Sequence, residues 1–108
     1  MSEQALFDVA AQGGIRLAAV IAGTCAFNPA DFVQYRQIIA LLKRDRDADI
    51  ALYGRKMDEV YACVQRLDAL RRTMPEDSRP VRKVKAEIVR LIDVIDRARG
   101  RVVERSRR

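Results

Sequence analysis

Two cysteines and a scattered set of carboxylates are the side chains of this 108-residue chain that are most able to do chemistry. Histidine, the residue that most often acts as an acid or base near neutral pH, is absent. Cys25 and Cys63 stand far apart and form neither a CxxC motif nor a paired metal spacing. We therefore expect two free, buried thiols, and no signal supports a disulfide between them.

The carboxylates do not form a catalytic or metal-binding set either. Asp93 and Asp96 stand three positions apart and could share a cation, but a metal site needs further ligands. Most other acids stand three or four positions from Arg or Lys, a spacing typical of ion pairs on solvated helix faces. Gly13-Gly14 belongs to neither a GxGxxG motif nor a P-loop. We therefore predict no catalytic, cofactor or metal site, no small-molecule substrate and no enzyme activity.

The basic residues concentrate in residues 97–108, RARGRVVERSRR, which contain six arginines and one glutamate. This segment carries +5 of the formal net charge of +6, so the rest of the chain is close to neutral. Clustered arginines can neutralise phosphates, so the alternative function is nucleic-acid binding, alone or as a small subunit of a nucleoprotein complex. No aromatic residue is interleaved to stack on bases, and cations also suit the end of a helix. The candidate residues are Arg97, Arg99, Arg101, Arg105, Arg107 and Arg108.

The composition indicates a folded, helical protein. Hydrophobic residues make up 49% of the chain and charged residues 33%, while five glycines and three prolines are too few for the many turns of a sheet protein. We expect a single all-α domain over residues 1–108, with residues 97–108 as a basic tail. The longest apolar run, residues 17–27, is about half the length of a membrane span. We therefore expect a cytoplasmic protein that does not insert in membranes.

Two signals define the N-terminal part of the fold. Apolar residues recur at helical spacing over about residues 4–23, which predicts a first helix; Gly13-Gly14 in its middle would kink it or admit a close neighbour. Asn28 can cap the next helix, and Pro29 fits a first turn, where its missing N–H is not needed. The second helix is therefore expected to begin at about residue 29.

The longest apolar stripe runs through residues 29–74. Its members are three or four positions apart, with one extra step of four inside the charged stretch KRDRDADIALYGRK. An extra step of four is typical of a stutter, so we predict one uninterrupted helix over about 29–74, about 68 Å long. The alternative is a break near residues 45–49, where Asp45, Asp47 or Asp49 could cap a new helix. The stripe consists of Tyr35, Ile39, Leu42, Arg46, Ile50, Tyr53, Met57, Val60, Val64 and Leu67.

The segment TMPEDSRP, residues 73–80, separates this helix from the next. Pro75 ends one helix, and Pro80 suits the first turn of another. The apolar residues that follow alternate steps of three and four, which predicts a third helix over about 80–104, and Val89 and Ile92 widen its stripe. Because the loop is short, we expect the two helices to form an antiparallel hairpin. The stripe consists of Val81, Val84, Ile88, Leu91, Ile95, Ala98 and Val102.

The apolar surface of this three-helix arrangement exceeds what one copy can cover, because the C-terminal helix is shorter than its predicted neighbour. We therefore expect a helical homodimer. The predicted function is a small non-enzymatic protein-interaction module, of the regulator, adaptor or anti-activator type, which binds a partner protein and itself. The predicted contact residues are Leu6, Val9, Leu17, Val20, Tyr35, Ile39, Leu42, Ile50 and Tyr53.

Overall fold

Four α-helices and one short 3-10 helix make up residues 3–107, the part of the chain that the computed structural model describes; for residues 3–7 this is the backbone alone. The elements are α1 (Glu3–Ala22), η1 (Pro29–Phe32), α2 (Val33–Lys43), α3 (Ala48–Arg71) and α4 (Arg79–Ser106). No strand occurs among these residues. The all-α prediction is therefore confirmed, but this part of the chain has four α-helices and not the three predicted.

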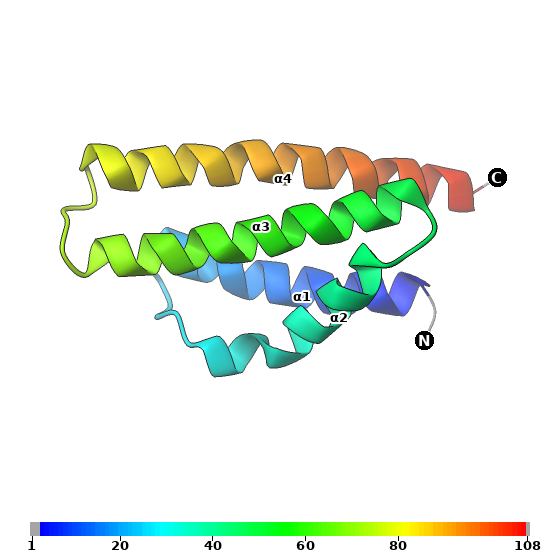
Figure 1. Ribbon diagram of the computed structural model, residues 1–108, viewed down its shortest axis with the longest axis horizontal. Helices are drawn as coiled ribbons and strands as arrows, with labels where there is room; N and C mark the ends of the chain where they lie inside the picture. The colour runs from blue at the N-terminus through cyan, green and yellow to red at the C-terminus, as the bar shows by residue number, and fades with distance from the viewer. Residues whose placement is uncertain (1–2, 108) are drawn as a thin grey trace.

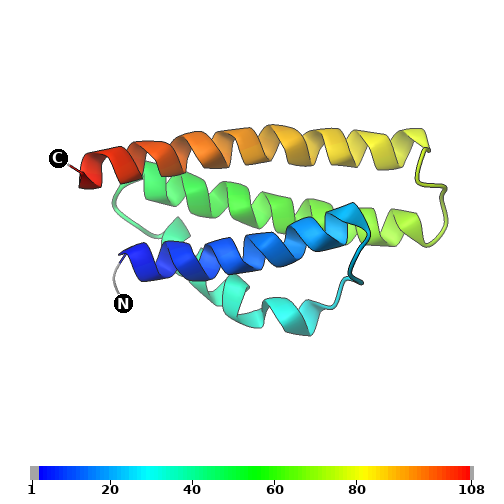
Figure 2. The same ribbon diagram turned by 180° about the vertical axis from the view of Figure 1, so that it is seen from behind.

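Helix α3 is the centre of the arrangement, because α1, α2 and α4 all pack against it. Figure 1 shows α3 and α4 side by side and running in opposite directions, with the loop between them at one end of the molecule. Figure 2 shows the molecule from the other side: α1 runs parallel to α3, and α2 crosses below α1. The helices pack compactly, and the molecule measures 48 × 26 × 21 Å.

The predicted continuous helix over 29–74 is wrong, because the chain turns between Lys43 and Ala48 and α2 packs back on α3. Asp47 caps the new helix: its side chain accepts hydrogen bonds from the backbone N–H groups of Asp49 and Ile50, at 2.8 and 3.3 Å. The cap satisfies N–H groups that have no partner inside a helix. A straight helix of about 68 Å would also exceed the 48 Å length of the molecule.

Two glycines allow α2 to approach its neighbours closely, Gly54 at this turn and Gly13 near the start of α2. A Cβ atom on Gly54 of α3 would lie 2.8 Å from the backbone nitrogen of Lys43, at the end of α2. A Cβ atom on Gly13 of α1 would lie 2.1 Å from Cδ2 of Tyr35, so the ring occupies the space that a side chain would need. The Tyr35 hydroxyl donates a hydrogen bond to the carbonyl oxygen of Met57 at 2.9 Å. These contacts fix α2 between α1 and α3.

Helix α4 confirms the clearest sequence pattern. Six of the seven residues in its predicted stripe are buried, and Val84 packs partly buried against the same core. The helix begins one residue before, and ends two residues after, the predicted 80–104. Buried side chains from all four α-helices join in one hydrophobic cluster. Most of the core is therefore closed within one copy of the chain.

Arg71, in the last turn of α3, connects three segments. Its guanidinium donates hydrogen bonds to the carbonyl oxygens of Val20 (2.7 Å) and Ile21 (2.6 Å) at the end of α1. Val20 also accepts a hydrogen bond from the backbone N–H of Gly23 at 3.0 Å. The same group binds the carboxylate of Glu76 in the loop before α4, and Lys85 of α4 also pairs with Glu76. Hydrogen bonds from Arg71 and then Lys85 lower the pKa of Glu76 to about 2.

Candidate functional site

Most of the residues predicted to bind a partner lie inside the core of the chain. Each of the seven members between residues 17 and 53 is at most 3% exposed: Leu17, Val20, Tyr35, Ile39, Leu42, Ile50 and Tyr53. Val9 is partly buried, and the side chain of Leu6 lies outside the described side chains. Leu17 and Tyr53 reach the lining of a surface groove, but a partner would reach most of the other five only if the helices separated. Their role in partner binding stays a prediction.

An apolar groove lies between α1 and α4, with α3 as its floor and a volume of about 370 Å³. We call it the α1–α4 groove. Small and branched side chains of α1 form one wall, Tyr53, Met57 and Val60 of α3 form the floor, and α4 forms the other wall. The wall residues are Ala11, Gly14, Ile15, Leu17, Ala18 and Ile21 on α1, with Ile92, Ile95, Asp96 and Arg99 on α4.

Large apolar side chains on both walls of this groove face solvent. Ile15 is 72% exposed and Ile92 is 41% exposed. Val89, one turn before Ile92 on α4, is 66% exposed. The sequence carried a signal for this surface, because Val89 and Ile92 widen the α4 stripe beyond what α3 alone can cover. Exposed apolar side chains on facing walls are typical of a site for a partner helix.

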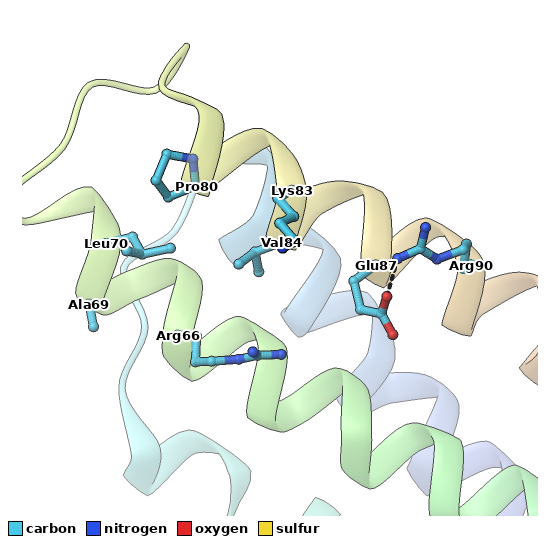
Figure 3. A pocket seen from close by; sticks show the side chains of 8 residues that line it. All are labelled: Arg66, Ala69, Leu70, Pro80, Lys83, Val84, Glu87 and Arg90. Carbon is cyan, nitrogen blue, oxygen red and sulfur yellow. Dashed lines mark hydrogen bonds and ion pairs between the residues drawn. The ribbon is translucent and has the colours of Figure 1, made fainter.

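A second groove lies between the C-terminal half of α3 and the first turns of α4, with a volume of about 660 Å³ (Figure 3). We call it the basic groove. Leu70 of α3 and Val84 of α4 point toward one another across it. Three cations line it, and its one acid, Glu87, forms an ion pair with Arg90. The lining residues are Arg66, Ala69, Leu70, Pro80, Lys83, Val84, Glu87 and Arg90.

Residues 97–106 of the Arg-rich C-terminal segment belong to α4. Arg101 donates a hydrogen bond to the carboxylate of Asp49 at 2.8 Å, and Arg105 binds both Asp49 and Asp47 at the start of α3. Arg97 pairs with Asp93 at 3.1 Å. Three of the six candidate arginines thus have their charge balanced within the chain.

The remaining candidate arginines have different positions. Arg99 lines the α1–α4 groove beside Asp96, and Arg107 follows the last residue of α4. Arg108 lies outside the described residues. Nucleic-acid binding by this end of the chain stays a prediction.

The carboxylates at the start of α3 have lowered pKa values. For Asp47, desolvation raises the pKa, but hydrogen bonds from Arg105 and from the N–H groups of Asp49 and Ile50 outweigh it. For Asp49, hydrogen bonds from Arg105 and Arg101 lower the pKa. These acids therefore stay ionised near neutral pH and hold α4 against the start of α3.

The most reactive side chains among the described residues do not lie together in one site. Both cysteines are free, but Cys25 is exposed, contrary to the expectation of two buried thiols, whereas Cys63 is buried. Burial raises the pKa of the phenols of Tyr35 and Tyr53. In the described part of the chain, no three His, Cys, Asp or Glu side chains lie close enough together to hold a metal ion. No helix within that part is both long enough and apolar enough to cross a membrane.

Comparison with known proteins finds no matching family model, no matching curated protein and no matching solved structure. Two features of the surface stand out: the α1–α4 groove has exposed apolar side chains on its walls, and the basic groove has three cations and one acid.

Proposed function

We propose that this protein is a small non-enzymatic protein-interaction module that binds an amphipathic helix in the α1–α4 groove. The observation that carries the proposal is the exposure of Ile15 and Ile92 on opposite walls of one apolar groove. Covering an exposed isoleucine side chain completely contributes about 1.5–3 kcal/mol. Two such anchors, placed over a floor formed by Met57 and Val60, suit a helix with apolar residues at helical spacing.

A second copy of the chain is one partner that this surface suits, which supports the predicted homodimer. Val89, Ile92, Asp96, Arg99 and Val103 follow one another on α4 at steps of three and four. If a second α4 lies antiparallel with its Asp96 opposite Arg99, then Ile92 comes opposite Val103. Opposite charges and apolar side chains then match across the two-fold axis, as an isologous interface requires.

The test compares three surface substitutions that introduce the same charge, two inside the groove and one outside it. Ile15→Asp and Ile92→Asp each place a carboxylate in the α1–α4 groove, whereas Leu41→Asp places one on α2, where Leu41 is 56% exposed outside the groove. Affinity capture and sedimentation velocity should show loss of partner and self-association for the two groove variants and retention for Leu41→Asp. If all three behave like the wild type, the groove is not the binding site.

The homodimer has its own test. Asp96→Arg alone should weaken self-association, because it places two arginines opposite one another, and adding Arg99→Asp should restore it. A double variant that dissociates further would contradict the antiparallel pairing of α4. Partner capture that persists in a monomeric variant would leave the helix-binding proposal intact without the homodimer.

A further inference from the structure

The first turns of α4 carry cations that nothing in the described part of the chain neutralises. Arg79, Arg82 and Lys83 have no carboxylate within ion-pair distance among these residues, and neither does Arg66 of α3, which lines the basic groove together with Lys83. The first turn of α4 contains no acidic residue. The N-terminal end of a helix is itself positive, so cations there repel one another and the helix dipole. An anionic partner would remove this repulsion.

We propose that the basic groove binds an acidic, partly apolar peptide segment of a partner protein. Its carboxylates would pair with Arg66 and Lys83 on the two sides of the groove. An apolar side chain would enter between Leu70 and Val84, which point toward one another across the groove (Figure 3). The site shares no residue with the α1–α4 groove, so this proposal does not depend on the one above.

The apolar part of the groove favours a peptide over a nucleic acid. Leu70, Pro80 and Val84 offer aliphatic surface that rewards burial of a methyl or isobutyl group, and a phosphate backbone has neither. No aromatic side chain lines the groove, so it has no platform on which a base would stack. Charge provides attraction for either anion, but the aliphatic surface selects the peptide.

Glu87 is the one acid that lines the basic groove, and it opposes the binding of an acidic peptide. Its carboxylate lies within the basic groove, where a hydrogen bond from Arg90 and the charges of Arg90, Arg66 and Lys56 lower its pKa. It is therefore ionised at neutral pH and repels the carboxylates of an incoming peptide. Glu87→Gln should strengthen binding of an acidic peptide by removing this repulsion and releasing Arg90 for the ligand.

The experiment measures fluorescence anisotropy of a short labelled peptide that carries Glu and Leu at helical spacing. Lys83→Glu should weaken binding about tenfold, which corresponds to about 1.4 kcal/mol, whereas Glu87→Gln should strengthen it. Arg55→Glu is the matched control, because Arg55 is exposed on α3 outside the groove and the charge change is the same. Circular dichroism checks that each variant remains folded.

Two further probes separate the sources of binding. A peptide with Gln in place of Glu should not bind, because the cations then have no carboxylate to pair with. Labelled single-stranded oligothymidine should bind more weakly than the acidic peptide. The proposal is overturned if oligothymidine binds more tightly, or if Arg55→Glu weakens peptide binding as much as Lys83→Glu does.

Discussion

Gly54 of α3 lies in direct contact with the backbone of Lys43 at the end of α2, with room for a hydrogen atom but not for a methyl group. A Cβ atom would lie 2.8 Å from the Lys43 nitrogen and 2.9 Å from Cβ of Leu42. Gly54→Ala should therefore destabilise the protein by about 1–3 kcal/mol, because helix backbone and not a flexible side chain would have to move. Chemical denaturation monitored by circular dichroism measures this change.

Gly100→Ala is the control for the Gly54 substitution. Gly100 is also inside a helix, but nothing lies within 4 Å of the Cβ atom it lacks. Alanine there should stabilise the protein by up to about 1 kcal/mol, because glycine is the poorer helix former. A Gly54→Ala variant as stable as Gly100→Ala would contradict the close approach of α2 to α3 at Gly54.

The contact of Gly54 with the end of α2 belongs to a turn that the sequence pattern did not predict, although the pattern predicted the buried residues well. Apart from Arg46, the members of the 29–74 stripe are all buried, as expected. Two short helices that fold against one another bury the same residues as one long helix would, so the spacing does not distinguish them. The extra step of four coincides with the turn, and the cap at Asp47 decides the path. Local capping chemistry was therefore the better signal.

The candidate site was harder to predict from the sequence than the core. Val89 and Ile92 widen the apolar stripe of α4, which predicts apolar surface beyond the contact with α3. No sequence pattern predicts that Ile15 of α1 is exposed, because its exposure depends on how α1 lies on α3. The basic groove was hidden for a different reason. Arg66 and Lys83 are distant in the sequence and come together only where α3 and α4 pack against one another.

The cap at the start of α3 is open to direct test. Asp47→Ala removes the side chain that accepts hydrogen bonds from two N–H groups, and it should cost about 0.5–2 kcal/mol. Asp47→Asn keeps an accepting oxygen but removes the charge that pairs with Arg105, so it should recover most of the loss. Thermal denaturation of the three proteins gives the order. An alanine variant as stable as the wild type would contradict the break in the helix.

Arg71 should contribute more to stability than its neighbour Arg72. Arg71→Met keeps the aliphatic part of the side chain but leaves the carbonyl oxygens of Val20 and Ile21 without these donors, at a cost of about 1.5–3 kcal/mol. Arg72 is exposed and pairs, among the described residues, with Asp68 four positions earlier, so Arg72→Met should change stability by less than about 0.5 kcal/mol. Urea denaturation compares the two variants, and equal losses would exclude this role of Arg71.

Stability should fall as the pH is lowered through the range in which Glu76 is protonated. Its pKa is about 2 in the folded protein, below the ordinary value of 4.5, so the unfolded chain binds more protons between these values. The contribution is complete above about pH 4.5 and is lost as the pH falls toward 2. Asp47 and Asp49, whose pKa values are also lowered, add to this loss in the same direction.

Urea midpoints measured over this pH range test the contribution of Glu76. Glu76→Gln should reduce the acid dependence, since the variant has no carboxylate to protonate at this position. High salt should reduce it as well, because Glu76 is exposed and its interactions are screened. A Glu76→Gln variant with the same acid dependence as the wild type would contradict the pairing of Glu76 with Arg71 and Lys85.

Photocrosslinking in cells tests the α1–α4 groove most directly. A photoreactive amino acid at position 89 lies beside the groove, one turn from its wall residue Ile92 on α4. It is compared with the same residue at position 41 on α2; both positions are exposed, at 66% and 56%. We predict a discrete crosslinked protein from position 89, either a second copy of the chain or a helical segment of a partner, and none from position 41. Equal products from both positions, or none from position 89, would contradict the account.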